Sequence, residues 1–109
     1  ALVISVNEYN ANVGGFFKNI LDWLSRLDRK FLQDKKILLM STSPGKRGGA
    51  SALEYCKNQF PRFGGEIVES FSLPQFYENF DSEKGTIGNE VFDLGVAEVL
   101  TSFIQEIKG

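Results

Sequence analysis

Two stretches of the chain decide its fold: LVISVNEYNANVGG at residues 2–15 and ILLMSTSPGKRGG at residues 37–49. Each starts with an apolar run of the length of a buried strand and continues into a loop rich in Gly, Asn or Ser. The run at 37–40 is apolar on both faces, as strands of parallel sheets usually are. Both stretches therefore predict a strand that ends in a loop and leads into a helix.

The rest of the chain continues this alternation. An amphipathic pattern predicts a first helix after residue 15, and a second helix follows residue 49 and stops at residues 64–65. Residues 67–73 are typical of a third strand, residues 74–86 of a loop, and a last helix is expected from about residue 87 to the end. The stripes of the first and last helices are Phe17, Ile20, Leu21, Leu24 and Leu27, and Phe92, Val96, Val99, Phe103 and Ile107.

The order β-α-β-α-β-α predicts a parallel sheet with helices on both faces. Ligands of such sheets bind beyond the carboxyl ends of the strands. Because the loops at 7–15 and 41–49 both follow strands, we expect them to lie at this same edge of the sheet.

The composition limits the chemistry of the chain. It has 109 residues, the size of one domain, with one Cys, no His and a net charge of −2. Cys/His zinc sites, disulfides within the chain and Ser–His or Cys–His catalysis are excluded. The charge argues against nucleic-acid binding, and no apolar run approaches the about 20 residues that span a membrane. We expect a cytoplasmic location, and Cys56, on an apolar stripe, as a core residue.

The first loop places Glu8, Tyr9 and Asn10 directly after a strand. Backbone amides at such a turn can bind anions or polar ring edges, and Tyr9 adds an aromatic face. Alternatively, Asn and Gly only form the turn and cap the helix. The residues alone leave both interpretations open.

The second loop, SPGKRGG at 43–49, combines glycines with two cations. Glycine permits close backbone approach to a flat or phosphorylated ligand, and Lys46 and Arg47 can attract a nucleotide phosphate. The loop lacks the spacing of a Walker A motif. The alternative is a flexible connection with two solvated cations.

Together, the two loops resemble the signature of the NADPH-dependent FMN reductase family. In that family a strand is followed by P-E-Y-N, then P-G, then L-K-N-A-x-D-W-L-S. This chain has NEYN at 7–10, GG at 14–15 and KNILDWLS at 18–25. The loop at 43–49 resembles the family's second conserved loop. The resemblance covers the whole chain, although residues 66–109 match only in general pattern.

The resemblance implies a flavodoxin-like α/β fold with strand order 2-1-3-4-5. Residues 1–109 would form one domain that supplies strands 3, 4 and 5 and lacks the N-terminal half. The family's phosphate loop, G-S-x-R-x-x-S, does not occur here. The strand at 2–6 would therefore present an unpaired apolar edge unless another segment completes the sheet.

The resemblance also implies FMN as cofactor and NAD(P)H as co-substrate, with electrons passing to a small-molecule acceptor such as a quinone. A homodimer or tetramer is implied, without a nucleic-acid or membrane partner. No metal and no catalytic side chain are needed, since the flavin itself receives the hydride. The implied contacts to the flavin are Asn7, Glu8, Tyr9, Asn10, Ser43, Pro44, Gly45, Gly48 and Gly49, and Lys46 and Arg47 would bind the 2′-phosphate of NADPH.

Two positions of the first loop depart from the family pattern. Asn7 and Gly14 stand where the family has proline, and both changes are expected to loosen the loop. This leaves two alternatives to an enzyme. One is a flavodoxin-like binding or interaction module without turnover, and the other is a structural fragment that folds only with a partner.

Overall fold

The computed structural model describes residues 1–108, and for Tyr9 the backbone alone. Three strands, β1 (Leu2–Val6), β4 (Lys36–Thr42) and β5 (Glu66–Leu73), form a parallel sheet in the order β1-β4-β5. The connections between them pass through α1 (Gly15–Leu27) and α2 (Ala50–Gln59). This order is the one predicted for strands 3, 4 and 5 of a flavodoxin-like sheet.

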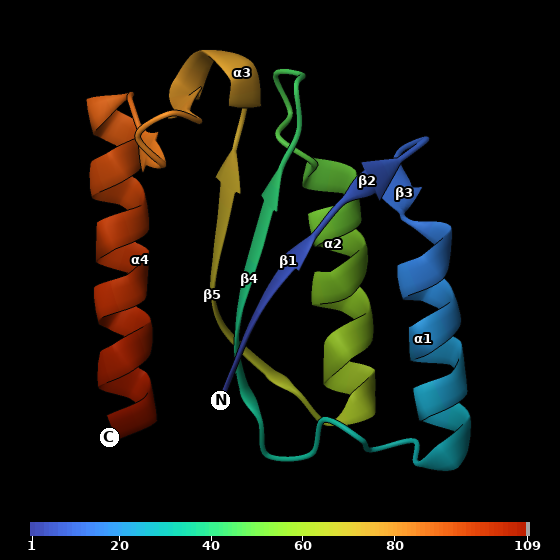
Figure 1. The fold of residues 1–109 in the computed structure, drawn as a ribbon. Coiled ribbons are helices and arrows are strands. Elements are labelled where there is room, and N and C mark those ends of the chain that lie inside the picture. The colour runs from blue at the N-terminus through green and yellow to red at the C-terminus, as the bar shows by residue number, and fades with distance from the viewer. Residues whose placement is uncertain (109) are drawn as a thin grey trace.

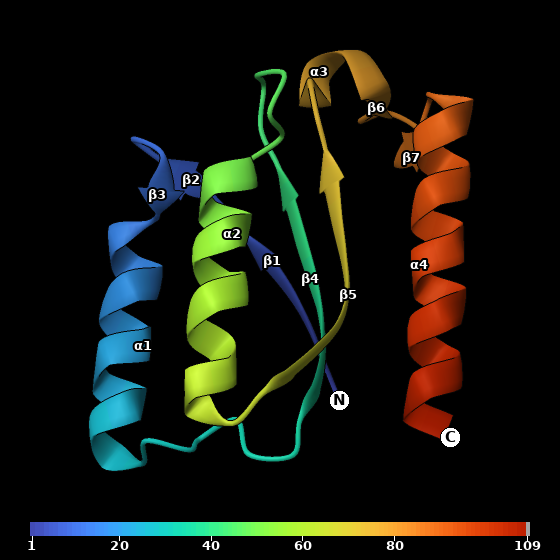
Figure 2. The ribbon, with the colours of Figure 1, turned by 180° about the vertical axis from the view of Figure 1, so that it is seen from behind.

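Helices cover both faces of the sheet, as predicted (Figure 1, Figure 2). Helices α1 and α2 lie on one face, and α4 (Glu90–Lys108) packs against β5 on the other. The Ser102 hydroxyl of α4 donates a hydrogen bond to Glu69 Oε1 of β5 at 2.6 Å. Of the predicted stripe on α4, Phe103 is buried, whereas Ile107 is exposed.

The main core lies between the sheet and the two helices α1 and α2. Alternate residues of β4 point into it, because side chains of a strand alternate between its faces. Cys56 is fully buried there, which confirms its predicted role. Burial raises the pKa of its thiol from 9.0 to about 12, so the sulfur stays protonated at neutral pH and is a poor nucleophile. The buried members of this core are Val6, Val13, Leu21, Leu32, Ile37, Leu39, Ala52, Leu53, Cys56 and Phe60.

Two predicted loops contain regular structure. The first loop forms a short hairpin of β2 (Glu8–Tyr9) and β3 (Asn12–Val13). The pattern missed it because its strands are only two residues long and its turn lacks the Asn-Gly or Asp-Gly signal of tight hairpins. The segment after β5 forms α3 (Phe76–Asn79) and a hairpin of β6 (Phe80–Asp81) and β7 (Thr86–Ile87).

The second helix ends earlier than its apolar pattern suggests. After α2 the chain tightens into a 3₁₀ turn, η1 (Phe60–Phe63), with Pro61 near its start. Gly64 then ends this turn in the left-handed region at φ 92°. A Cβ there would lie 2.9 Å from the Gln33 backbone, so the predicted glycine stop is also a packing requirement.

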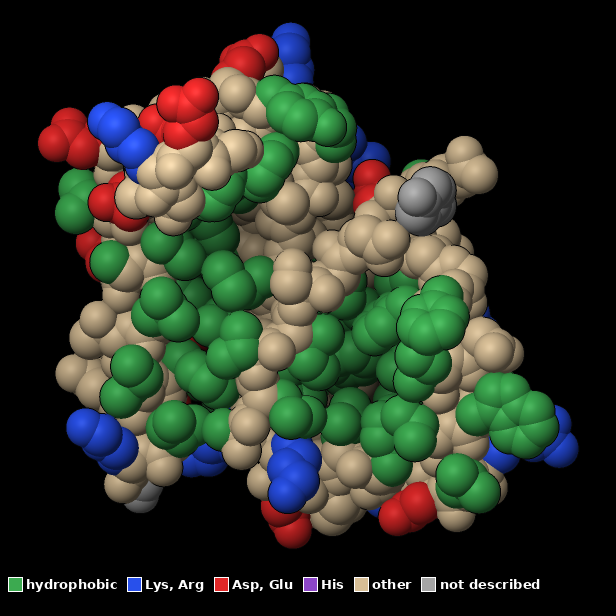
Figure 3. Space-filling view, viewed as in Figure 1, with side chains coloured by type: hydrophobic (Ala, Val, Ile, Leu, Met, Phe, Trp, Pro, Cys, Tyr) green, Lys and Arg blue, Asp and Glu red, His purple; other side chains and the backbone are tan. Residues whose placement is uncertain are grey.

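Strand β1 is the edge of the sheet and pairs only with β4 in the part of the chain that the structure describes. Leu2 and Val3 are 37% and 58% exposed. In Figure 3 apolar side chains gather on both sides of β1, toward α4 and toward α1. Strands of parallel sheets are normally covered on both faces, so this edge has the surface of an inner strand.

Candidate functional site

The two predicted binding loops meet at the carboxyl edge of the sheet. They follow β1 and β4, which are parallel neighbours, so both loops leave the sheet at the same end. A side chain joins the first loop to α2, the helix that follows the second loop: Glu8 Oε1 accepts a hydrogen bond from the Ala52 amide at 2.9 Å. This confirms that the loops share one edge of the sheet.

Glu8 also serves the start of α2. The residue at the N-cap of this helix is Gly49, which has no side chain to bind the free amides of the first turn. The Glu8 carboxylate supplies that missing acceptor and places negative charge at the positive end of the helix. We predicted that Glu8 contacts the flavin, and sequence reasoning missed its role at α2. The sequence offered one signal for this role: Gly49 has no side chain that could cap α2, so an acceptor from elsewhere in the chain was needed.

The first loop is held by its own hairpin. Glu8 pairs with Val13 and Tyr9 with Asn12, which leaves Asn10 and Ala11 as a two-residue turn. Both turn residues have positive φ, 49° and 62°. Asn tolerates this region, but Ala is strained in it. The side chain of Tyr9 lies outside what the structure describes, so its contact with the flavin stays a prediction.

The two departures from the family pattern contact each other. A Cβ built on Gly14 would lie 2.9 Å from Asn7 Oδ1. Gly14 has φ −63° and ψ 149°, a backbone conformation that proline can adopt. The side chain of Asn7 therefore occupies the space that a proline at position 14 would need.

The end of the second loop is fixed to the sheet. The hydroxyls of Ser41 and Ser72 donate hydrogen bonds to the Gly48 carbonyl at 2.7 and 2.8 Å. Gly48 has φ 60°, and its Cβ would lie 2.9 Å from the backbone of Leu73. Gly49, at φ 80°, is similarly close to Ser41. Packing against the strands therefore explains both glycines without a cofactor. Their contact with a cofactor stays a prediction.

The tip of the second loop is exposed and presents backbone amides. The carbonyls of Ser43 and Gly45 accept hydrogen bonds from the amides of Phe76 and Gln75, at 2.9 and 2.8 Å. Within residues 1–108, no protein acceptor binds the amides of Gly45, Lys46 and Arg47. Three successive free donors suit a ligand with carbonyl or anionic oxygens.

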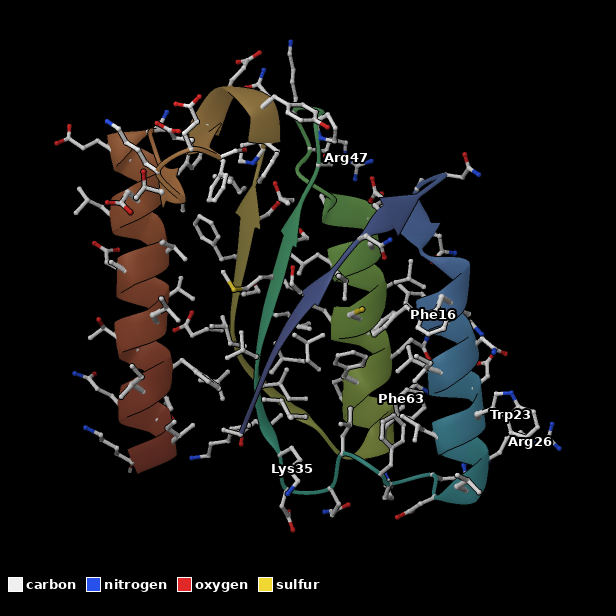
Figure 4. All side chains as sticks on the ribbon, viewed as in Figure 1. Phe16, Trp23, Arg26, Lys35, Arg47 and Phe63 are labelled. Carbon is white, nitrogen blue, oxygen red and sulfur yellow. The ribbon has the colours of Figure 1, made fainter. Side chains whose placement is uncertain are left out.

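The side chains of Lys46 and Arg47 are also exposed, and Figure 4 shows Arg47 at the carboxyl edge of the sheet. A small cavity of about 170 Å³ lies beside these loops, lined by strand ends and aromatic residues of the α3 segment. Small-molecule pockets usually measure about 300–1,000 Å³, so this cavity is too small for a flavin. The predicted residues thus form an open surface. The residues lining the cavity are Ser5, Met40, Ser41, Thr42, Phe71, Leu73, Phe76, Phe80 and Ile87.

Two other kinds of structural feature are not found within residues 1–108. No group of three His, Cys, Asp or Glu side chains is placed to hold a metal ion. None of the helices described combines the length and apolarity needed to cross a membrane.

Comparisons with known proteins agree with this arrangement. The family model described as NADPH-dependent FMN reductase matches residues 1–78. Proteins named quinone reductase from Escherichia coli K12, Escherichia coli O157:H7 and Shigella flexneri are each 32% identical to the chain over 117 aligned positions. The alignment covers 98% of this chain but 60% of each relative, so the chain spans about three fifths of their length.

Proposed function

Because the chain belongs to the NADPH-dependent FMN reductase family, we propose that it forms the flavin-ring side of an FMN-dependent NAD(P)H oxidoreductase. The observation that carries the proposal is the exposed tip of the second loop. Its free amides at Gly45, Lys46 and Arg47 lie at the sheet edge where ligands of such folds bind. They fit the carbonyl oxygens on the pyrimidine edge of a flavin ring.

The first loop would form the other wall of the site. Its hairpin is anchored to the start of α2, directly after the second loop, by the hydrogen bond from the Ala52 amide to Glu8. Since the Glu8 carboxylate is engaged with Ala52 and the Asn7 side chain lies against Gly14, we propose that Glu8 holds the first loop against the start of α2 and that Tyr9 and Asn10 face the ring. Bound FMN would supply the hydride chemistry, and the residues of this chain would bind and orient it.

Lys46 and Arg47 are proposed to recognise the co-substrate. Their exposed charges beside the free amides suit the 2′-phosphate of NADPH, and a guanidinium can bind phosphate through two hydrogen bonds. We expect the double variant Lys46→Ala/Arg47→Ala to raise KM for NADPH about tenfold while KM for NADH changes little. Equal effects on both KM values would contradict this role. The acceptor is proposed to be a small flat molecule such as a quinone.

The edge of β1 is proposed to pair with a further parallel strand outside these 109 residues. The support is the exposure of Leu2 and Val3 and the apolar surface on both sides of β1 in Figure 3. A strand added there would complete the sheet and bring its own loop to the carboxyl edge. That loop would hold the FMN phosphate, for which this chain has no G-S-x-R-x-x-S sequence.

The proposal includes a homodimer in which α1 contacts a second copy. Apolar residues on α1 recur at spacings of four, three and four residues, which is the pattern of a helix that packs along a second helix. These residues are Phe16, Ile20, Trp23 and Leu27. Phe16, Trp23 and Leu27 are 82%, 62% and 81% exposed, although Leu27 was predicted to lie on the buried stripe. Figure 4 shows Phe16 and Trp23 on α1. Sedimentation should show that Trp23→Lys weakens self-association, whereas Leu94→Lys on α4 does not.

FMN binding tests the main proposal. The complete protein should quench flavin fluorescence and retain a yellow chromophore. The 109-residue chain alone should bind FMN about 100-fold more weakly, because about 3 kcal/mol of phosphate hydrogen bonds is missing. A complete protein that fails to retain FMN would show that the proposal is wrong. If it retains FMN but oxidises no NADPH with any quinone, the alternative of a non-catalytic binding module is correct.

A further inference from the structure

A second, basic site lies away from the carboxyl edge, in a groove between α1 and the α2–η1 segment. The groove encloses about 500 Å³, within the range of about 300–1,000 Å³ that small-molecule pockets occupy. Its exposed rim carries Arg26 and Arg29 from one side and Arg62 from the other. Figure 4 shows Arg26 near the far end of α1, remote from Arg47.

The charges on this rim are not balanced by carboxylates. Asp22 is the one carboxylate in the lining, and it is bound by Lys18 Nζ at 2.7 and 2.9 Å. Within residues 1–108, no carboxylate lies within 4.0 Å of the guanidinium groups of Arg26, Arg29 and Arg62. Arg29 and Arg62 border the groove, and Arg26, also in its lining, points outward beside Trp23 in Figure 4. In a chain of net charge −2, these arginines concentrate positive potential at one end of α1.

The floor of the groove is apolar and aromatic. Leu21 is buried there, and Tyr55 and Phe63 are half-buried. In Figure 4 Phe63 lies between α2 and α1. Phe63 is fixed in place, because its carbonyl accepts the Leu32 amide at 3.0 Å and its ring centroid lies 5.0 Å from that of Phe31.

The two walls of the groove are joined at its end. Lys30 Nζ, just after α1, donates a hydrogen bond to the Arg62 carbonyl at 3.4 Å. With the Leu32 contact, this bond connects the segment after α1 to η1 on the opposite wall. The groove is therefore formed before any ligand binds, which lowers the cost of binding.

From this combination we propose that the groove binds a nucleoside phosphate, with its phosphates on the arginine rim and its flat base on the Tyr55–Phe63 floor. Arginine matches phosphate geometry through paired hydrogen bonds, and an aromatic floor suits a planar ring. The site is separate from the proposed flavin site and does not depend on it. Its ligand would regulate or localise the protein and would take no part in hydride transfer.

Calorimetry with three probes tests the arginine rim and the aromatic floor of the site separately. The complete protein, saturated with FMN, is titrated with ADP, inorganic pyrophosphate and adenosine at low salt. ADP should bind about tenfold more tightly than pyrophosphate, since one stacked ring adds about 1–1.5 kcal/mol. Adenosine should bind weakest. Equal affinities for ADP and pyrophosphate would overturn the assignment of the base to the floor, and no binding of either would overturn the site.

Variants and spectra then locate the binding. Arg62→Ala should weaken ADP binding at least about tenfold, and the matched loss of charge in Lys84→Ala, in the β6–β7 turn, should not. In amide correlation spectra, ADP should shift signals from residues 18–29 and 55–63. If Arg47→Ala abolishes binding and Arg62→Ala does not, the nucleotide sits at the second loop and the proposal is wrong. Because FMN is present throughout, failure here leaves the proposed flavin site untouched.

Discussion

The two loops at the carboxyl edge are built by different means. The first is held by a local hairpin, in which non-glycine residues accept positive φ, and it reaches the rest of the chain through Glu8. The second is bonded to the ends of the strands by Ser41 and Ser72 and depends on Gly48. The first loop can therefore vary in sequence apart from Glu8 without loss of the fold, whereas the second cannot vary at Gly48. Substitutions in each loop test this difference.

The largest effect is expected at Gly48. The substitution Gly48→Ala forces a Cβ to within 2.9 Å of the Leu73 backbone and 2.5 Å of Ser72 Oγ, at φ 60°. Left-handed strain and overpacking together should lower the free energy of unfolding by about 3 kcal/mol. Urea unfolding of the variant measures this loss.

Gly45→Ala is the matched control in the same loop. The nearest atom to its new Cβ would be Ser43 Oγ at 3.9 Å. We expect a change below about 0.5 kcal/mol, as at other surface positions. Similar losses of stability for Gly48→Ala and Gly45→Ala would show that the second loop is not divided into a packed part and an open part.

The link between the first loop and α2 should have the next largest effect. Glu8→Ala removes the acceptor of the Ala52 amide and is expected to lower the free energy of unfolding by about 1.5 kcal/mol. Glu8→Gln keeps an acceptor oxygen without the charge and should recover part of this loss. Glu54→Ala, exposed on α2, serves as the control. If Glu8→Ala costs no more than Glu54→Ala, the first loop is independent of α2.

The contact between Asn7 and Gly14 predicts a coupled effect. Gly14→Pro alone should destabilise the protein by about 1 kcal/mol, because the ring meets the Asn7 side chain. Asn7→Pro/Gly14→Pro removes that obstacle and should rigidify the loop. Thermal unfolding of the single and double variants gives a coupling energy of about 1 kcal/mol.

The same variants measure whether stiffness in the first loop matters for the flavin. Asn7→Pro and the double variant should bind FMN up to about fivefold more tightly, since less loop entropy is lost on binding. Fluorescence quenching gives the dissociation constant. An unchanged or higher constant would mean that the loop was already rigid enough because of its hairpin.

The smallest effect is expected in the turn of that hairpin. Ala11→Gly relieves a non-glycine residue at φ 62° and should stabilise the protein by about 0.5–1 kcal/mol. Asn10→Gly, at φ 49°, should gain less, because Asn tolerates this region. Denaturant midpoints compare the two. A loss of stability in Ala11→Gly would mean that the turn is not strained.

The sequence predicted the parts of the fold that depend on local pattern. Apolar runs located the three strands, and their alternation with helices placed both loops at one edge. The hydrogen bond between Glu8 and Ala52 could not be predicted, because its partners are 44 positions apart and no local pattern connects them. The exposure of Leu27 was missed for a related reason: a pattern shows that a face is apolar but not what covers it.

For the glycines of the second loop, the sequence predicted the need for a small residue but not the neighbours that require it. Gly48 and Gly49 were expected to let a ligand approach, and their sequence context gave no sign of the strand ends that press against them. Tertiary contacts decide such positions. The composition of a loop identifies flexible residues but does not say which neighbour requires the flexibility.

The bond between Glu8 and Ala52 also has a kinetic consequence. The Ala52 amide can exchange its hydrogen with water only when the first loop moves away or the start of α2 frays. Its exchange rate therefore reports the opening of the first loop from a position outside that loop. Any molecule that holds the loop closed will slow exchange at Ala52, whether or not it touches α2.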